Sequence, residues 1–200
     1  MSVRDRKAAL RDAGRGRIRS GGEGSARQAD SRKVQENFLA RFPPVPGSRV
    51  ALYTALPGEV DTERIREAYL AAGVSLFYPR AEGDGELRFY PHRRGDGWVR
   101  GRFGIPEPLP GPGVEGIREG FDLIVVPGVA FDASGRRLGQ GLGYYDRFLS
   151  GPGGRATAVG LAYSWQIVPE VPVDPWDVPV DAVVTEKGVL EAAGGEPLRT

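Results

Sequence analysis

The segment that most constrains the fold is a strand predicted at residues 121–126. It is a run of apolar and β-branched residues, interrupted only by Asp122 and ended by Pro127 and Gly128. Such a run is typical of a strand that is buried on both faces, as in a parallel sheet. We therefore expect the residues that follow it to lie at an edge of that sheet.

The first half of the chain gives a second indication of a parallel sheet. Residues 49–55 and 74–79 each predict a strand, and apolar residues at helical spacing lie between them. Asp61 or Thr62 can cap this helix, and Gly73 ends it. A strand, a helix and a strand in so few residues form a βαβ unit, so the sequence predicts a three-layer α/β/α fold with a mostly parallel sheet. Further strands are predicted at 86–90, 98–100, 156–163 and 178–185, the last of which ends the sheet.

The amino-acid composition limits the kinds of catalytic and metal sites that the chain can form. The 200 residues are 40% hydrophobic and 26% charged, which suits one domain over residues 1–200. Cysteine is absent and His92 is the only histidine, so Cys/His zinc sites cannot form and a catalytic triad would need His92. Residues 90–95 are polar and turn-like, and we expect His92 to be an exposed structural residue. The remaining Asp, Glu, Lys, Arg and Tyr residues fit magnesium-assisted phosphoryl transfer.

Charge and hydropathy limit the expected location and partners. No stretch approaches the length of a membrane span and no signal-peptide pattern is present, so we expect a cytoplasmic protein without a membrane partner. The net charge is +1, but residues 1–41 carry eleven Lys or Arg against five Asp or Glu. A basic arm of this kind can bind nucleic acid, although the near-zero net charge does not favour such a partner. We expect residues 1–30 to be a basic, partly irregular segment and residues 194–200 to be a disordered tail.

The N-terminal region predicts two helical stretches separated by a break. Its first residues have helix-forming composition and place Lys7 and Arg11, four residues apart, on one face. Glycine-rich segments at 13–17 and 20–24 then predict a mobile or irregular connection. Helical spacing resumes only at residues 31–42.

A glycine-rich motif follows the central strand. Gly139, Gly141 and Gly143 occupy alternate positions just before a helix predicted at residues 144–149. Such glycines let backbone N–H groups turn toward a ligand, and the helix end behind them adds a positive partial charge. The pattern therefore predicts a phosphate-binding loop.

The alternative is a glycine-rich surface turn, because the chain has 30 glycines. The motif matches neither the Rossmann fingerprint nor the Walker pattern. Three charged residues nevertheless favour a binding site: Arg136 and Arg137 can hold phosphate oxygens, and Asp146 is a hard oxygen ligand suited to Mg²⁺. The combination of a cradle, cations and a carboxylate favours a site over a turn.

These residues resemble the signature of a known family. The order R-L-G-x-G-x-G-Y-Y-D-R at 137–147, preceded by V-P-G-x-A-F-D at 126–132, is similar to that of the 5-formyltetrahydrofolate cyclo-ligase family. Lys7 and Arg11 match the opening K-x-x-x-R of that family, and residues 54–62 resemble its folate-side loop. Further resemblances lie at residues 103–108, 164–169 and 175–181.

The resemblance implies a reaction and a fold. ATP would drive cyclisation of 5-formyltetrahydrofolate to 5,10-methenyltetrahydrofolate, by phosphorylation of the formyl oxygen, with release of ADP and phosphate. Mg²⁺ would be the cofactor, and the fold would be the variant shared with sugar-phosphate isomerases and CoA transferases. The expected partners are ATP and the folate, and we expect a monomer or a weak homodimer.

The resemblance also implies roles for individual residues. Lys7 and Arg137 are the expected catalytic residues, Asp146 and Asp177 the expected Mg²⁺ ligands, and Asp181 is expected to be structural. The residues expected to bind ATP are Lys7, Arg11, Arg137, Gly139, Gln140, Gly141, Leu142, Gly143, Tyr144 and Tyr145. The residues expected to bind the folate are Thr54, Glu59, Phe103, Gln140 and Tyr144.

Two other functions remain open. A non-catalytic nucleotide- or RNA-binding protein could use the same fold and the basic arm, and it would show steeply salt-dependent binding without ATP consumption. A related isomerase or acyl transferase is a further alternative, which the fold alone cannot support. The presence of Lys7, Arg11, Arg137, Asp146 and Asp177 together favours an active enzyme.

Overall fold

The centre of the molecule is a seven-stranded sheet. The computed structural model describes residues 1–20, 24–83 and 85–192. The strand order is β11-β10-β9-β6-β1-β2-β3, in which the five inner strands are parallel and β3 and β11 are antiparallel edges. The strands are β1 (Arg49–Ala51), β2 (Ser75–Ala81), β3 (Leu87–Pro91), β6 (Leu123–Val126), β9 (Thr157–Leu161), β10 (Ala182–Thr185) and β11 (Gly188–Glu191).

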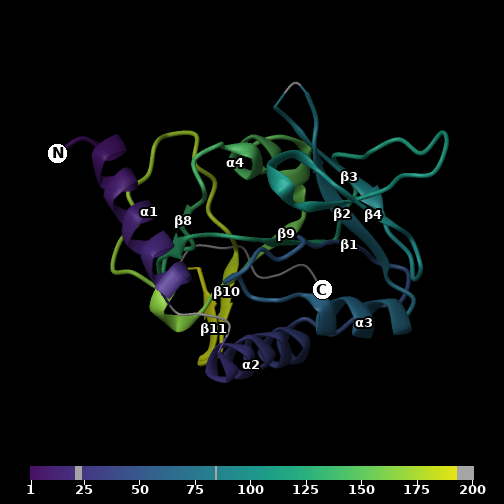
Figure 1. The fold of residues 1–200 in the computed structure, drawn as a ribbon, viewed down its shortest axis with the longest axis horizontal. Coiled ribbons are helices and arrows are strands. Elements are labelled where there is room, and N and C mark those ends of the chain that lie inside the picture. Colours follow the sequence, from purple (N-terminus) through teal and green to yellow (C-terminus); the bar gives the residue numbers. More distant parts are fainter. Residues whose placement is uncertain (21–23, 84, 193–200) are drawn as a thin grey trace.

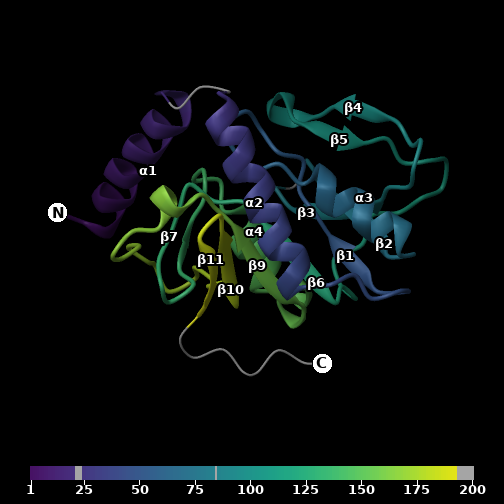
Figure 2. The same ribbon diagram turned by 90° about the horizontal axis from the view of Figure 1, so that it is seen from below.

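Helices cover both faces of the sheet, as Figures 1 and 2 show. They are α2 (Ser25–Arg41) and α3 (Glu63–Ala71) on one face and α4 (Tyr144–Leu149) on the other. On the first face, Phe38 of α2 and Val125 of β6 belong to one buried cluster. On the second, Phe148 of α4 and Ile124 of β6 belong to another. The prediction of a three-layer α/β/α fold with a mostly parallel sheet is therefore confirmed.

Strand β6 explains why its sequence is apolar throughout. Successive side chains of a strand point to opposite faces, so Ile124 and Val125 enter different layers. β6 also has β1 on one side and β9 on the other, which leaves no exposed edge. The predicted doubly buried central strand is confirmed.

The connections out of β1 and β6 diverge. The chain continues from β1 to β2 on one side of the sheet and from β6 to β9 on the other. In open α/β sheets, ligands bind where such a reversal separates the loops that follow two neighbouring strands. The loops concerned here are residues 52–62 and 127–143.

Two small antiparallel sheets flank these loops. A ribbon of β4 and β5 lies at one end of the molecule, and a hairpin of β7 and β8 lies near the N-terminal helix (Figures 1 and 2). Their bounds, with those of three short 3₁₀ helices, are β4 (Trp98–Arg100), η1 (Arg102–Gly104), β5 (Pro106–Pro108), β7 (Ala130–Phe131), β8 (Arg137–Leu138), η2 (Pro152–Arg155) and η3 (Ser164–Gln166).

The N-terminal helix differs from the prediction. α1 (Val3–Ser20) runs without interruption through both glycines of residues 13–17, so the predicted irregular segment there is wrong. Gly14 faces Val129, and a Cβ at Gly14 would come within 2.4 Å of the Val129 side chain. Packing thus requires a glycine in the helix. α2 begins at Ser25 rather than residue 31, and the rest of the predicted connection includes residues outside the described part.

Two further predictions are corrected. His92 is buried rather than exposed, because its ring stacks on that of Trp98 at 4.0 Å between centroids and contacts the edge of Tyr78. The sheet does not end at β10, since β11 pairs with it. The predicted tail at 194–200 lies outside the described residues. Asp181 accepts a hydrogen bond of 2.7 Å from the backbone of Ala158, a contact of the structural kind expected for it.

Candidate active site

One large cavity lies at the carboxyl edge of the sheet. Its volume is about 1020 Å³, at the upper limit of ordinary small-molecule pockets. Its walls come from α1, the loop after β1, the β4–β5 ribbon, residues 137–147 and residues 174–177. All the predicted site residues whose side chains the structure describes line this cavity, with the exception of Arg136. Predicted residues from four separate segments thus line one cavity, while their individual roles stay predictions.

The glycine-rich loop connects β8 to α4 along one wall. Gly141 and Gly143 have φ angles of +103° and +67°, which L side chains rarely adopt. Gly139 is required for a different reason, because a Cβ there would lie 2.7 Å from Nη1 of Arg137. Gly141 and Gly143 thus provide the backbone conformation of the loop, and Gly139 leaves space for the Arg137 guanidinium.

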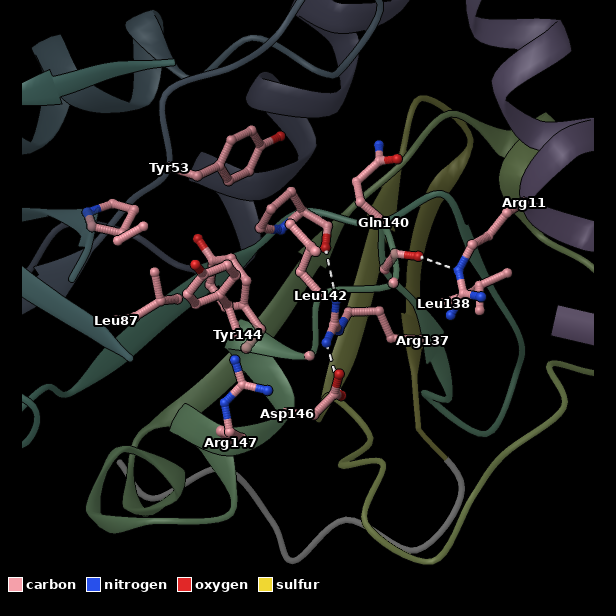
Figure 3. Close-up of a pocket in the computed structure, with 18 of the residues that line it drawn as sticks. Arg11, Tyr53, Leu87, Arg137, Leu138, Gln140, Leu142, Tyr144, Asp146 and Arg147 are labelled. Carbon is pink, nitrogen blue, oxygen red and sulfur yellow. Dashed lines mark hydrogen bonds and ion pairs between the residues drawn. The ribbon is translucent and has the colours of Figure 1, made fainter. Parts of the chain in front are cut away.

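Arg137 is the buried cation of this wall. Its Nη2 donates a hydrogen bond of 2.8 Å to Oδ1 of Asp146, and its Nη1 donates a longer one of 3.4 Å to the carbonyl of Pro127 (Figure 3). Its guanidinium also lies 5.7 Å from the ring centre of Tyr145. Because these contacts fix the group from several directions, Arg137 is held in place before any ligand arrives.

The α1 helix places a row of cations beside this loop. Nε of Arg11 donates to the carbonyl of Gly139 at 3.0 Å (Figure 3). Arg15 donates to both the side-chain oxygen and the carbonyl of Gln140, at 3.0 and 2.9 Å. The sequence prediction missed Arg15, although it continues the four-residue spacing of Lys7 and Arg11. Arg11 and Arg15 therefore bind the glycine-rich loop of the same chain, an arrangement that does not favour an RNA-binding arm.

Lys7 is held by two carboxylates. Its Nζ contacts Oδ2 of Asp174 at 2.6 Å and also Oδ2 of Asp177. Burial lowers the pKa of the Lys7 ammonium, but the two carboxylates outweigh this effect and the pKa is raised overall. Lys7 is therefore charged at neutral pH. Asp174 was not predicted as a site residue, and its only signal in the sequence is its position three residues before Asp177.

The two predicted metal ligands are both engaged by cations. Asp146 pairs with Arg137, and Asp177 pairs with Lys7. Within the described residues, no group of three or more Asp, Glu, His or Cys side chains could hold a metal ion. In phosphoryl-transfer sites, however, Mg²⁺ is held by only one or two carboxylates together with substrate phosphates. Two carboxylates in one cavity fit that kind of donor set.

The loop after β1 forms another wall of the cavity. Thr54 and Glu59 come from the loop after β1, and Oε2 of Glu59 accepts a hydrogen bond of 3.0 Å from the backbone N–H of Leu56. Burial raises the pKa of Glu59 to about 7, although this hydrogen bond opposes the shift. The hydroxyl of Tyr145 is buried and has no hydrogen-bond partner within the described structure. This part of the cavity therefore suits an organic group with polar edges.

Two other predicted residues require comment. Phe103 lies in η1, but its side chain is outside the described part; its neighbours Arg102 and Ile105 line the cavity. Arg136 was expected to face phosphate oxygens in the site, but it does not line the cavity. Its Nη1 instead lies 3.9 Å from Oδ2 of Asp132 and 3.7 Å from Oε1 of Glu170. Arg136 and Arg137 are consecutive residues in the β7–β8 hairpin, and consecutive side chains of extended backbone point to opposite sides, so Arg137 lines the cavity and Arg136 does not.

The fold and the cavity together define an α/β protein with a large cavity, lined by cations and a glycine-rich loop, at the edge of a parallel sheet. The sequence model of the 5-formyltetrahydrofolate cyclo-ligase family matches residues 4–186. The chain belongs to this family, as its motifs predicted.

Individual relatives agree with the family match. The chain is 34% identical over 158 residues to the 5-formyltetrahydrofolate cyclo-ligase of Escherichia coli (strain K12), covering 76% of this chain and 86% of that one. It is 31% identical over 152 residues to the enzyme of that name from Mus musculus, covering 69% and 73%. The NMR structure of 5,10-methenyltetrahydrofolate synthetase from Aquifex aeolicus superimposes with a TM-score of 0.78 at 38% identity, covering 97% of this chain and 96% of that one.

No helix in the described ranges combines the length and the apolar character that crossing a membrane would require.

Proposed function

We propose that the protein uses ATP to convert 5-formyltetrahydrofolate into 5,10-methenyltetrahydrofolate. The observation that carries this proposal is the division of one cavity into two ends. Arg11 and Arg137 lie with the glycine-rich loop on one side of the cavity, and Tyr53, which directly precedes Thr54, lies on the other (Figure 3). Lys7 and Glu59 also line the cavity. A cavity of about 1020 Å³ has room for both a nucleotide and a folate.

The chemistry needs activation of the formyl group. The formyl oxygen attacks the γ-phosphorus of ATP, and the bond from that phosphorus to the bridging oxygen breaks to release ADP. N10 of the folate then attacks the formyl carbon and loses its proton, while the carbon–oxygen bond to phosphate breaks. The products are the methenyl cation, ADP and phosphate, and the protein supplies no covalent nucleophile.

The phosphate end stabilises the charge that spreads over the transferring phosphoryl group. Arg137 offers a forked set of donors whose position is already fixed by Asp146, so little reorganisation is needed during transfer. Lys7 adds a point charge, and the loop at 139–143 offers backbone N–H groups. Asp146 and Asp177 would hold Mg²⁺, which when bound neutralises phosphate charge.

The folate end orients the second substrate. Thr54, Glu59 and Tyr144 line the cavity and offer polar groups to a pterin ring and its formyl substituent. Alignment of the formyl oxygen with the γ-phosphorus contributes much of the rate enhancement, because the two substrates then react within one complex instead of by a chance encounter.

The test is an assay of the purified chain with Mg-ATP and 5-formyltetrahydrofolate, in which ADP release and the absorbance of the methenyl product are followed together. Equal amounts of both products are expected. The absence of methenyl product from active reagents would overturn the proposal. Salt-sensitive RNA binding without ATP consumption would support the RNA-binding alternative instead.

A further inference from the structure

Two large apolar side chains at the rim of the cavity are exposed. Trp176 is 68% exposed and Leu142 is 51% exposed, and both line the cavity. Single exposed apolar residues on a surface are common and need no explanation. These two instead border the same cavity, beside its cationic end. Within the described part of the chain, the ring of Trp176 stacks on no other aromatic ring and has no cation over it.

The turn that carries Trp176 is firmly attached beside Lys7. The backbone N–H of Asp174 donates to Oδ2 of Asp177 at 2.7 Å, and the N–H of Asp177 donates to the carbonyl of Asp174 at 3.1 Å. Both carboxylates also hold the ammonium of Lys7. The indole therefore projects from a fastened turn whose two ends contact the same phosphate-end cation.

We propose that Trp176 forms the base-binding surface for the nucleotide, with the adenine ring of ATP stacked on the indole and Leu142 in apolar contact beside it. The triphosphate then extends from this rim toward Lys7 and Arg137. The inference rests on the function proposed above, and it adds the base subsite to it. An exposed indole suits this task because every purine presents a flat face, and stacking on an aromatic side chain needs no further polar group.

The experiment compares Trp176→Ala and Trp176→Phe with a matched control, Trp98→Phe. Trp98 is also partly exposed, but its ring is stacked on His92 and does not line the cavity. Three quantities are measured in the full chain: KM for ATP and for 5-formyltetrahydrofolate, the affinities for ADP and for inorganic tripolyphosphate, and quenching of tryptophan fluorescence by ADP.

In Trp176→Ala, KM for ATP and the dissociation constant of ADP should rise roughly 5- to 150-fold, the equivalent of about 1–3 kcal/mol of stacking. Tripolyphosphate affinity and KM for the folate should stay within about twofold of wild type, since neither involves the base. Trp176→Phe should retain part of the ADP affinity. ADP should quench fluorescence in wild type and Trp98→Phe but much less in Trp176→Phe.

Unchanged ADP affinity in Trp176→Ala would overturn the inference. So would an equal loss for ADP and tripolyphosphate, which would indicate a disturbed phosphate end, or a selective rise in KM for the folate, which would place the pterin on the indole. Failure of the proposed function has a different signature: wild-type protein would then form no methenyl product, whatever the Trp176 variants show in ADP binding.

Discussion

Arg137 and Asp146 stand at opposite ends of the glycine-rich loop and are joined by a hydrogen-bonded ion pair of 2.8 Å. The pair closes the segment between β8 and α4, and both side chains line the cavity. Arg137 is more deeply buried than Asp146, with 3% and 17% of their side chains exposed. A residue expected to bind phosphate thus also holds the loop in shape.

Arg137→Ala should lower kcat roughly 10²–10³-fold, by analogy with the loss of one preorganised charge-stabilising donor. Arg137→Lys should recover only part of this, because a point charge cannot reproduce two parallel hydrogen bonds. The measurement is kcat at saturating ATP and folate. Full activity in Arg137→Ala would reduce the residue to a scaffold, and full activity in Arg137→Lys would mean that charge alone suffices.

Asp146→Asn should reduce turnover most strongly at limiting Mg²⁺, because an amide is a poorer ligand for this ion than a carboxylate.

Asp146→Asn should also weaken the hydrogen-bonded ion pair that keeps the Arg137 guanidinium in place. Removal of one partner from a buried ion pair destabilises a protein by about 3–5 kcal/mol, and partial exposure of Asp146 should reduce this figure. Chemical denaturation of Asp146→Asn, Arg137→Ala and the double variant measures the coupling. Additive free energies of unfolding would show that the pair contributes nothing to the fold, and wild-type activity of Asp146→Asn at limiting Mg²⁺ would remove Asp146 from the metal site.

Glu59 and Lys7 should affect different substrates. They lie at the folate end and the phosphate end, so Glu59→Gln should chiefly raise KM for 5-formyltetrahydrofolate, whereas Lys7→Ala should impair the use of ATP. Initial-rate kinetics with each substrate varied in turn separate the two effects. If both variants changed KM for the same substrate equally, the proposed division of the cavity into a folate end and a phosphate end would be contradicted.

Glu59→Gln should also change how stability depends on pH. The pKa of Glu59 is about 7 in the folded protein against an ordinary value of 4.5, so the folded state retains a proton that the unfolded chain releases as pH rises. Stability contributed by this group is therefore fully present below pH 4.5 and is lost as pH increases to about 7. Relative to wild type, Glu59→Gln should gain up to about 3 kcal/mol across this range, since one pKa unit corresponds to about 1.4 kcal/mol. Urea unfolding at pH 4.5 and pH 8 tests this, and a pH-independent difference would show that the carboxyl is not buried as described.

Two glycines of α1 form a matched pair. A Cβ at Gly16 meets nothing within 4 Å, so Gly16→Ala should stabilise the helix by about 1 kcal/mol. At Gly14 the same change brings a Cβ to 2.4 Å from the buried Val129, so the clash should outweigh the gain and displace α1. Because α1 carries Arg11, Gly14→Ala should also raise KM for ATP, while Gly16→Ala should not. Thermal unfolding and ATP kinetics measure both effects, and equal behaviour of the two variants would contradict the described packing of α1.

The sequence predicted the layers and most of the cavity, because both depend on local patterns. The apolar run at 121–126 predicts a buried strand, and the glycine-rich segment predicts a tightly turned loop, without knowledge of the residues that contact them. The errors arose where a distant contact decides the outcome. Gly14 indicates a helix break from its residue type alone, whereas the structure shows that contact with Val129 leaves no room for a Cβ there. His92 lies in a polar stretch, but the ring of Trp98 covers it. Asp174 could not be recognised as a partner of Lys7, which is 167 residues away.

That long separation has a consequence for how the molecule is made. Protein synthesis delivers the N-terminal helix first, and domains begin to fold before the chain is finished. Lys7 then has no acidic partners until the ribosome has added Asp174 and Asp177. The parallel strands β1, β2 and β6 can be in place by that time, but the wall of the cavity that contains Lys7 cannot be completed earlier, so a nascent chain acquires its scaffold well before it acquires a complete cavity.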